Sequence, residues 1–295
     1  MQELGVGVAS VNMCSEMIDR ADIEPVATSR DAAIGREAPV LARVDGWGVN
    51  IATLADAVKV TADAAERAEP AAVFTLNLDH LVKLRTSAAF RRAYRTARYV
   101  TADGAPVVHL ARSQSAAIER TTGADMVLPL AEEAARRGLP VYLFGSSPEV
   151  LGRAGRRLAD NTDGRLSIAG SESPAMGFDP EGAIADAAIE RIARSGARIC
   201  FVALGAPKQE ILAARAVEKG VPVVFVCIGA ALDFIAGAQV RAPGFMQRHG
   251  LEWIWRLATN PRRLTARYAQ CALLYAQLLV ARARHHETPT LAGNK

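Results

Sequence analysis

Residues 198–229 read RICFVALGAPKQEILAARAVEKGVPVVFVCIG. Two apolar runs, at 198–204 and 222–228, lie on either side of a helical pattern at 208–219. Both runs are continuously apolar rather than alternating, which is typical of strands whose sheet is covered by helices on both faces. The stretch therefore predicts two parallel strands joined by a right-handed helical crossover, the repeating unit of an α/β sheet.

The same alternation of strand and helix patterns begins near residue 39. Further strands are predicted at 40–45, 72–76, 98–102, 140–145 and 165–169. Further helices are predicted at 53–68, 79–95, 106–111, 124–138, 148–160 and 181–195. The sequence thus predicts a Rossmann-like, open and mostly parallel sheet with helices on both faces. In such a sheet, ligands bind at the carboxyl ends of the strands.

The composition is that of a globular protein kept in a reducing compartment. The 295 residues are 50% hydrophobic and 5% aromatic, with a net charge of +4. The four cysteines lie far apart, so neither a zinc site nor a disulfide framework is expected, and Cys200 and Cys227 are predicted to be core residues. We find no secretory leader and no apolar run long enough to span a bilayer, and therefore expect a cytoplasmic protein.

The C-terminal segment has a different character. Between 241 and 285 it carries eight arginines against one acid, Glu252, and it holds two of the three tryptophans. Such a segment is either a solvated basic helix pair or a surface that lies on anionic lipid, and we favour the second interpretation. We accordingly divide the chain into a loose leader at 1–38, an α/β core at 39–240 and a basic, membrane-associating helical appendage at 241–295.

One strand-to-helix turn is a candidate anion site. The chain has no G-x-x-x-x-G-K-[ST], and no G-x-G-x-x-G follows any strand, which disfavours a P-loop NTPase and a dinucleotide dehydrogenase. Its turn LGAPKQE at 204–210 instead passes through Gly205 into a helix opened by Pro207, whose free amide groups can hold an anion. Lys208 adds a positive charge there and Gln209 an amide. The alternative is an ordinary turn with a surface lysine.

A metal-dependent site is not expected. The chain contains no D-x-D, the carboxylate pair that usually holds Mg²⁺ or Mn²⁺ against a sugar nucleotide. A bound diphosphate would then have to be neutralised by protein cations, which the C-terminal arginines supply. We therefore predict neither a metal nor a cofactor.

A candidate catalytic acid lies in RYVTADGAPVVHLAR at 98–112. Asp103 stands between a strand end and a helix opened by Pro106, where a general base can face a bound substrate. As a helix N-cap it would instead contribute about 1 kcal/mol of stability. The same two alternatives apply to Thr75 and Asn77, which precede the helix at 79.

Seven sequence blocks together resemble the WecG/TagA/CpsF family of bacterial glycosyltransferases. The resemblance extends from about residue 43 to 270. It is carried by VDGWGVN, TLNLDHLVKLR, YVTADGAPVVHLAR, ERTTGADMVLPLAEEAARRGLPVYLFGSSPEVL, ALGAPKQE, CIGAALDFIAGAQVRAP and GLEWIWRLATNPRRLTARY.

The resemblance implies an inverting, metal-independent enzyme of cell-surface polysaccharide biosynthesis. It would move a hexose-type sugar from a UDP-sugar to a polyprenyl-diphosphate-linked saccharide at the inner face of the cell membrane. The resemblance makes Asp103 of the D-G motif, followed by Gly104, the catalytic base. It also implies substrate binding by the following residues: Thr75, Asn77, Gln209, Arg256, Arg263 and Arg267. Our candidate substrate-binding residues further include Gly104 beside the candidate base, and Gly205 and Lys208 of the turn at 204–210.

Two other functions are alternatives to a glycosyltransferase. A nucleotide-sugar oxidoreductase or epimerase would need a dinucleotide fingerprint, which the chain lacks. A catalytically silent, membrane-associated scaffold of a polysaccharide assembly complex remains the alternative. No nucleic acid partner is expected.

Overall fold

The computed structural model describes residues 39–286, without the side chains of Arg263, His285 and His286. The leader predicted at 1–38 and the end of the predicted appendage lie outside the described residues. Residues 39–286 form no helix that is long and apolar enough to cross a membrane.

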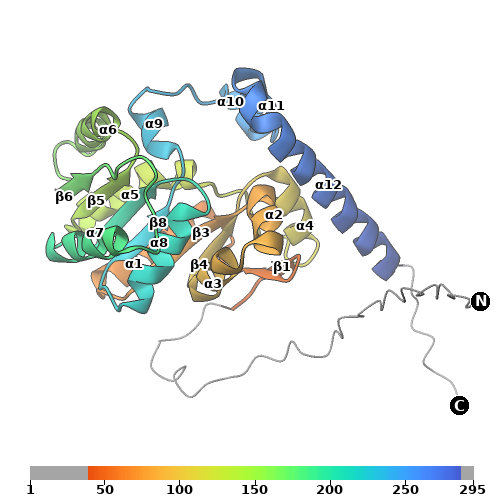
Figure 1. Ribbon diagram of the computed structural model, residues 1–295, viewed down its shortest axis with the longest axis horizontal. Helices are drawn as coiled ribbons and strands as arrows, with labels where there is room; N and C mark the ends of the chain where they lie inside the picture. The colour runs from red at the N-terminus through yellow and green to blue at the C-terminus, as the bar shows by residue number, and fades with distance from the viewer. Residues whose placement is uncertain (1–38, 287–295) are drawn as a thin grey trace, which may run out of the picture. The chain divides into compact units, whose positions relative to one another are not determined.

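The centre of the fold is a six-stranded parallel sheet with the order β4-β3-β8-β7-β5-β6 (Figure 1). All five neighbouring pairs are parallel. The strands are β3 (Ala71–Leu76), β4 (Tyr99–Ala102), β5 (Val141–Gly145), β6 (Ile168–Glu172), β7 (Ile199–Ala203) and β8 (Val224–Cys227). The predicted open α/β sheet is therefore confirmed.

Helices cover both faces of this sheet, which explains its continuously apolar strands. Successive strand residues point to opposite faces, so that Val73 and Phe74 of β3 are buried in two separate hydrophobic clusters. The cluster around Val73 includes residues of α1 (Leu54–Glu66), α5 (Gly123–Arg137), α6 (Pro148–Asn161) and α9 (Ala231–Ile235). The cluster around Phe74 includes residues of α2 (Leu78–Thr86), α3 (Ala88–Thr96), α4 (Ala105–Arg112), α7 (Ala183–Arg194) and α8 (Lys208–Glu218).

The first predicted strand lies outside the parallel sheet. β1 (Ala42–Val44) pairs antiparallel with β2 (Trp47–Val49), a strand that the sequence analysis missed. Asp45 and Gly46 between them have φ values of 51° and 83°. Two successive residues with positive φ are characteristic of a tight hairpin turn, for which Asp-Gly is a preferred sequence. The local turn chemistry, rather than the apolar run, decides the pairing of this segment.

Two other elements differ from the prediction. The helix predicted at 79–95 is divided into α2 and α3, because Ser87 has an extended backbone and its hydroxyl accepts from the Phe90 N–H, which starts a new helix. The strand predicted at 165–169 lies at Ile168–Glu172. This strand, β6, is at the sheet edge, so it tolerates polar residues such as Ser171 that a central strand would exclude.

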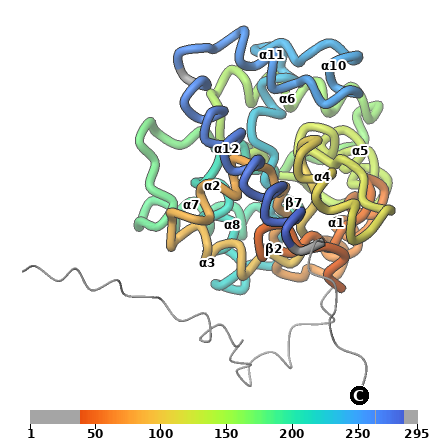
Figure 2. Tube along the Cα trace, turned by 90° about the vertical axis from the view of Figure 1, so that its right-hand side faces the viewer, coloured from red at the N-terminus to blue at the C-terminus, as the bar shows by residue number. Residues whose placement is uncertain are grey.

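The C-terminal segment contains α10 (Gly244–Arg248), α11 (Glu252–Thr259) and α12 (Pro261–His286). The long helix α12 runs beside α2 on the flank of the domain (Figures 1 and 2). Leu274 of α12 is buried in the cluster around Phe74, and Gln277 accepts from the Arg85 guanidinium of α2 at 3.0 Å. This helix is therefore anchored to the α/β sheet domain by both apolar and polar contacts.

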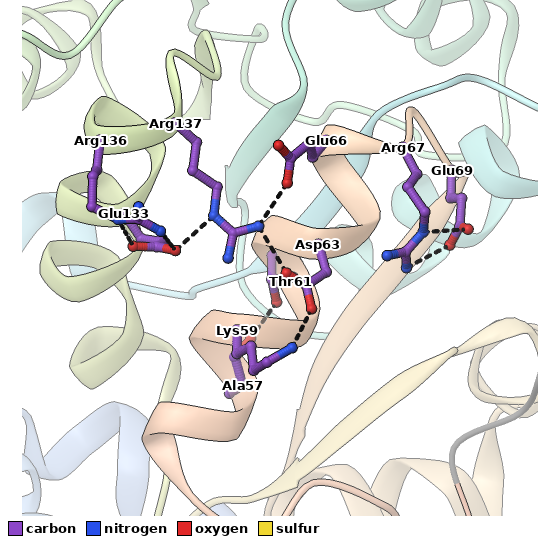
Figure 3. Close-up of polar contacts among 10 residues, drawn as sticks. All are labelled: Ala57, Lys59, Thr61, Asp63, Glu66, Arg67, Glu69, Glu133, Arg136 and Arg137. Atoms are coloured by element: carbon purple, nitrogen blue, oxygen red, sulfur yellow. Dashed lines mark hydrogen bonds and ion pairs between the residues drawn. The ribbon is translucent and has the colours of Figure 1, made fainter.

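A cluster of ion pairs joins α1 to α5 on the other face (Figure 3). Arg137 Nη1 of α5 lies 2.7 Å from Asp63 Oδ1 and 2.9 Å from Glu66 Oε2, both on α1, while its Nε lies 2.6 Å from Glu133 Oε1. Arg136 contacts only Glu133, on its own helix. Arg137 is thus the side chain that connects the two helices.

We expect Arg137→Ala to lower the free energy of unfolding by about 1 kcal/mol, because it dissolves an ion-pair network rather than one exposed pair. Arg136→Ala should cost clearly less. Hydrogen bonds from Lys59 and Arg137 hold the pKa of Asp63 below its usual value, and those from Arg136 and Arg137 hold the pKa of Glu133 at about 2. This stabilisation is therefore present above about pH 4 and is lost as the pH falls through the folded pKa values. Urea titrations at two pH values test this, and equal losses for both variants would contradict it.

Candidate active site

The carboxyl edge of the sheet collects candidate residues from neighbouring strands. β4, β3, β8 and β7 are consecutive in the sheet. The segments that follow them carry Asp103, Asn77, Gly229 and Gly205, respectively. Because the strands are parallel, these segments lie along one edge, the usual place for a ligand in an open α/β sheet.

Asp103 is held at this edge by its backbone. Its N–H donates to the carbonyl of Leu76 at 2.8 Å, which joins the ends of β4 and β3. The N-cap of α4 is Gly104, with φ +84°, and no side chain bonds to the first amides of that helix. The alternative that Asp103 caps the helix is therefore wrong, and its carboxylate faces another partner.

That partner is Asn77, at the start of α2. Its Oδ1 accepts from the His80 N–H at 2.9 Å and so caps α2, while its Nδ2 donates to Asp103 Oδ2 at 3.4 Å. Asn77 thus caps α2, one of the two alternatives that the sequence left open, and it also bonds to the candidate base, while its contact with a substrate remains a prediction. Thr75, two residues earlier in β3, is 5% exposed and lies within the strand.

The surroundings of Asp103 raise the pKa of its carboxyl above that of an ordinary aspartate. Burial raises the pKa of this carboxyl to about 6, against the lowering effects of Arg256, the Asn77 hydrogen bond and Arg120. Glu252 also raises it. At neutral pH such a group is mostly ionised, and it is more basic than an ordinary aspartate.

Two arginines that the site prediction did not include lie in this region. Arg120 Nη1 is 3.4 Å from Asp125 Oδ2 and 3.9 Å from Glu252 Oε2. Arg241 Nη2 is 2.6 Å from Asp125 Oδ1. The buried Arg241 Nε lies 3.6 Å from Glu252 Oε1 and makes no hydrogen bond among the described residues. Arg120 lies within the ERTTGAD block and Arg241 among the C-terminal arginines, but neither pattern indicates that they share Asp125.

The predicted arginines of the C-terminal helices take different positions. Arg256 of α11 lies 3.3 Å from Glu252, has its guanidinium 5.9 Å from the centre of the Phe234 ring, and influences Asp103 electrostatically. Arg267 of α12 is instead paired with Asp79 of α2 at 2.9 Å. Arg263 lies in α12, but its side chain is outside the described part of the structure. Arg256 is thus the predicted arginine associated with the candidate base.

The turn after β7 has the conformation expected of a glycine turn. Gly205 has φ +74°, and α8 begins at Lys208 with no side-chain cap. The Lys208 ammonium group donates to the Phe178 carbonyl at 2.8 Å, so it is tied to the loop before α7. The turn therefore offers backbone amides at the sheet edge rather than a free lysine.

Gln209 is buried, and both ends of its amide are occupied. Its Oε1 accepts from the Gly229 N–H at 3.0 Å, and its Nε2 donates to Glu210 Oε1 at 2.7 Å. Direct contact between Gln209 and a ligand remains a prediction. What the side chain does in the structure is connect the turn after β7 to the segment after β8. Glu210 was not among the site residues predicted from the sequence.

Among residues 39–286, no group of three or more His, Cys, Asp or Glu side chains is placed to hold a metal ion. The polar groups at the sheet edge are one carboxylate of raised pKa, its amide partner and several guanidinium groups. These groups can bind an anionic substrate and can accept a proton.

The fold and the candidate site together define an α/β protein with a carboxylate of raised pKa and arginines at the carboxyl edge of a parallel sheet. Residues 43–288 match the family model for glycosyl transferases of the WecG/TagA/CpsF family. The chain belongs to this family, which confirms the resemblance seen in its sequence blocks. It is accordingly a glycosyltransferase of polysaccharide biosynthesis.

Proposed function

We propose that this glycosyltransferase moves a hexose-type sugar from a UDP-sugar to a polyprenyl-diphosphate-linked saccharide, with inversion at the anomeric carbon and without a metal. The observation that carries this proposal is the carboxylate of Asp103, with a pKa raised to about 6, held by Asn77 at the sheet edge near Arg256. A catalytically silent scaffold would have no use for a carboxylate kept in this state.

In an inverting transfer, the acceptor hydroxyl attacks C1 of the donor sugar as the nucleoside diphosphate leaves. Asn77 bonds to Asp103 Oδ2, so Oδ1 is the oxygen that takes the hydroxyl proton. The proton moves to the carboxylate while the new glycosidic bond forms and the bond to the diphosphate breaks. Such general-base assistance is worth about 10²–10⁴-fold in rate.

The leaving diphosphate needs positive charge at the same edge. Arg120, Arg241 and Arg256 are the cations around Asp125 and Glu252. We propose that a bound diphosphate draws at least Arg256 away from Glu252, because this guanidinium is 48% exposed and held by only one acid at 3.3 Å. The backbone amides after Gly205 would add hydrogen-bond donors to the phosphates.

The experiment that tests this function measures UDP release by the purified full chain, with a detergent-solubilised polyprenyl-diphosphate-linked saccharide and a panel of UDP-sugars. Release that requires both one donor and the lipid-linked acceptor supports the proposal. Membrane binding without release for any donor and acceptor pair would favour the scaffold.

The acceptor is carried by lipid, and the surface near α10 and α11 suits contact with a membrane. Val240, Phe245 and Trp253 are 77%, 59% and 47% exposed, and exposed basic side chains such as Arg248 lie among them. Exposed apolar groups beside cations are the features by which peripheral proteins bind anionic bilayers. We propose that this surface, defined by residues 240–254, rests on the inner face of the cell membrane.

Replacing both Phe245 and Trp253 with serine is expected to weaken binding to anionic lipid vesicles by about 10-fold or more. The reason is that serine cannot bury the apolar area that each aromatic side chain buries in the lipid interface. Vesicle sedimentation with and without anionic lipid measures this. Ile184→Ser is the matched control, because Ile184 is 69% exposed on α7, a different helix. Equal losses for the double variant and the control would argue against this membrane surface.

A further inference from the structure

A group of buried polar side chains lies between α2, α3 and α8 and takes no direct part in the proposed reaction. Its members are His80, Tyr94 and Glu210, all less than 9% exposed. The Tyr94 hydroxyl lies 2.6 Å from His80 Nδ1, and His80 Nε2 lies 3.7 Å from Glu210 Oε1. Burying ionisable groups costs free energy unless they are hydrogen-bonded or paired, so the contacts among these three side chains stabilise their burial.

One end of this group is connected to the segment after β8. Glu210 Oε1 accepts from Gln209 Nε2 at 2.7 Å, which fixes the orientation of the Gln209 amide. Gln209 Oε1 is thereby turned toward the Gly229 N–H, 3.0 Å away. Gly229 has φ +58° and lies two residues after the end of β8, one of the two central strands. Its backbone conformation is therefore held by a side chain that Glu210 holds in turn.

The other end is connected to the candidate base. The backbone N–H of His80 donates to Asn77 Oδ1, and Asn77 Nδ2 donates to Asp103 Oδ2. The imidazole of the same histidine packs edge-on against Phe90 and Tyr94 and faces Glu210. The buried group is thus connected to Asp103 through Asn77 and to Gly229 through Gln209.

We propose that Glu210 is a positioning residue of this glycosyltransferase, which acts through Gln209 to fix the segment at Gly229 where the donor binds. The identity of the donor rests on the proposed function. The structural part of the proposal, the link from Glu210 to Gly229, does not.

The charge state of Glu210 makes the proposal measurable. Burial raises the pKa of this carboxyl to about 7, while hydrogen bonds from Gln209 and from its own backbone lower it. Burial also lowers the pKa of His80 to about 3, so the imidazole is neutral. An ionised carboxylate accepts a hydrogen bond more strongly than a neutral acid, so the Gly229 segment should become more ordered as the pH rises through about 7. The titratable groups around Glu210 on the neighbouring elements are Asp79, His80, Lys83, Tyr94 and Cys227.

The test is amide hydrogen exchange at Gly229 in the full chain without ligand, corrected for the intrinsic effect of pH. We compare wild type with Glu210→Leu, which removes the acceptor, and Glu210→Gln, which keeps it but does not titrate. In Glu210→Leu, exchange at Gly229 should be about 10-fold faster. In Glu210→Gln, the Gly229 amide should stay protected, and this protection should no longer change with pH near pH 7. The control is Glu218→Gln, which alters an exposed acid at the far end of α8.

Steady-state kinetics give a second readout. Glu210→Leu should raise KM for the donor more than it lowers kcat, and Glu210→Gln should restore KM. Unchanged protection of Gly229 in Glu210→Leu would overturn the proposal. If Glu210→Leu does not fold, the pH dependence of Gly229 protection in Glu210→Gln decides. Protection that still changes near pH 7 in this variant overturns the proposal, and protection that no longer changes there supports it. Because exchange needs no donor, failure of the proposed function is distinguishable from failure of this inference.

Discussion

Asp103→Asn is expected to lower kcat for sugar transfer by about 10²–10⁴-fold while UDP binding persists, because the amide keeps the shape of the side chain but cannot accept the hydroxyl proton. In the wild type, kcat/KM should rise with pH through about 6, where this carboxyl ionises. The residual activity of the variant should lack that step. UDP release and calorimetric UDP binding, measured over a pH series, provide both results.

The control for this variant is Asp160→Asn, the same chemical change at an exposed position at the end of α6. It should leave kcat and the pH profile unchanged. Asn77→Ala should move the apparent pKa of the base upward, since the Asn77 hydrogen bond lowers the pKa of Asp103. Transfer that is equally fast in Asp103→Asn would show that another group takes the proton.

Although Asp103→Asn is expected to lower activity, it is also expected to raise the stability of the folded protein. The pKa of Asp103 is raised on folding, from 3.8 to about 6, so the folded state binds more protons than the unfolded state in that interval. The wild type therefore loses stability as the pH rises from about 4 to 6, by at most about 3 kcal/mol, and remains less stable above this window. Asp103→Asn should be the more thermostable protein at about pH 8, and the gain should disappear near pH 4. A variant that is inactive yet more stable has lost a base rather than its fold.

Most of the sheet could be predicted from sequence because its strands are buried on both faces. Runs such as ICFVA and VFVC are apolar throughout and alternate with helical patterns, which together are typical of a parallel sheet between two helix layers. The β1–β2 hairpin was assigned wrongly because its pairing depends on the turn at Asp45 and Gly46, which the apolar pattern does not report. The division of α2 from α3 depends similarly on one hydroxyl, that of Ser87.

The site was predictable only in part, because its electrostatics depend on tertiary contacts. The strand-end rule leads to Asp103 and Asn77, but the hydrogen bond between them joins residues 26 positions apart. Arg241 and Asp125 are 116 positions apart, and no local pattern relates them. The family resemblance implies that Gln209 binds substrate, which remains a prediction, but it does not indicate that the Gln209 amide also joins Gly229 to Glu210. Such second-layer contacts become visible only when the strands are assembled.

The glycine with the tightest surroundings is Gly145, the last residue of β5. It has φ +106°, and a Cβ there would lie 2.4 Å from the carbonyl oxygen of Ala203 and 2.6 Å from its carbonyl carbon. Ala203 is its strand partner in β7, so the obstruction is backbone within the sheet. Ser146 follows with φ +59°, and its N–H donates to the same carbonyl. The chain can relieve the contact only by separating β5 from β7.

Gly145→Ala is therefore expected to cost at least about 3 kcal/mol in the free energy of unfolding, the sum of a left-handed alanine and a backbone collision. Two other glycines separate these contributions. Gly138 has φ +66°, and no atom lies within 4 Å of the place where a Cβ would stand. Gly138→Ala therefore carries only the conformational cost, about 1 kcal/mol. Gly152→Ala lies within α6, where the new methyl group meets only the end of Arg156 at 3.8 Å, and should be neutral or stabilising. Urea unfolding of the three variants should rank them in this order. If Gly145→Ala loses no more than Gly138→Ala, the close approach of β7 to Gly145 is not a constraint on the fold.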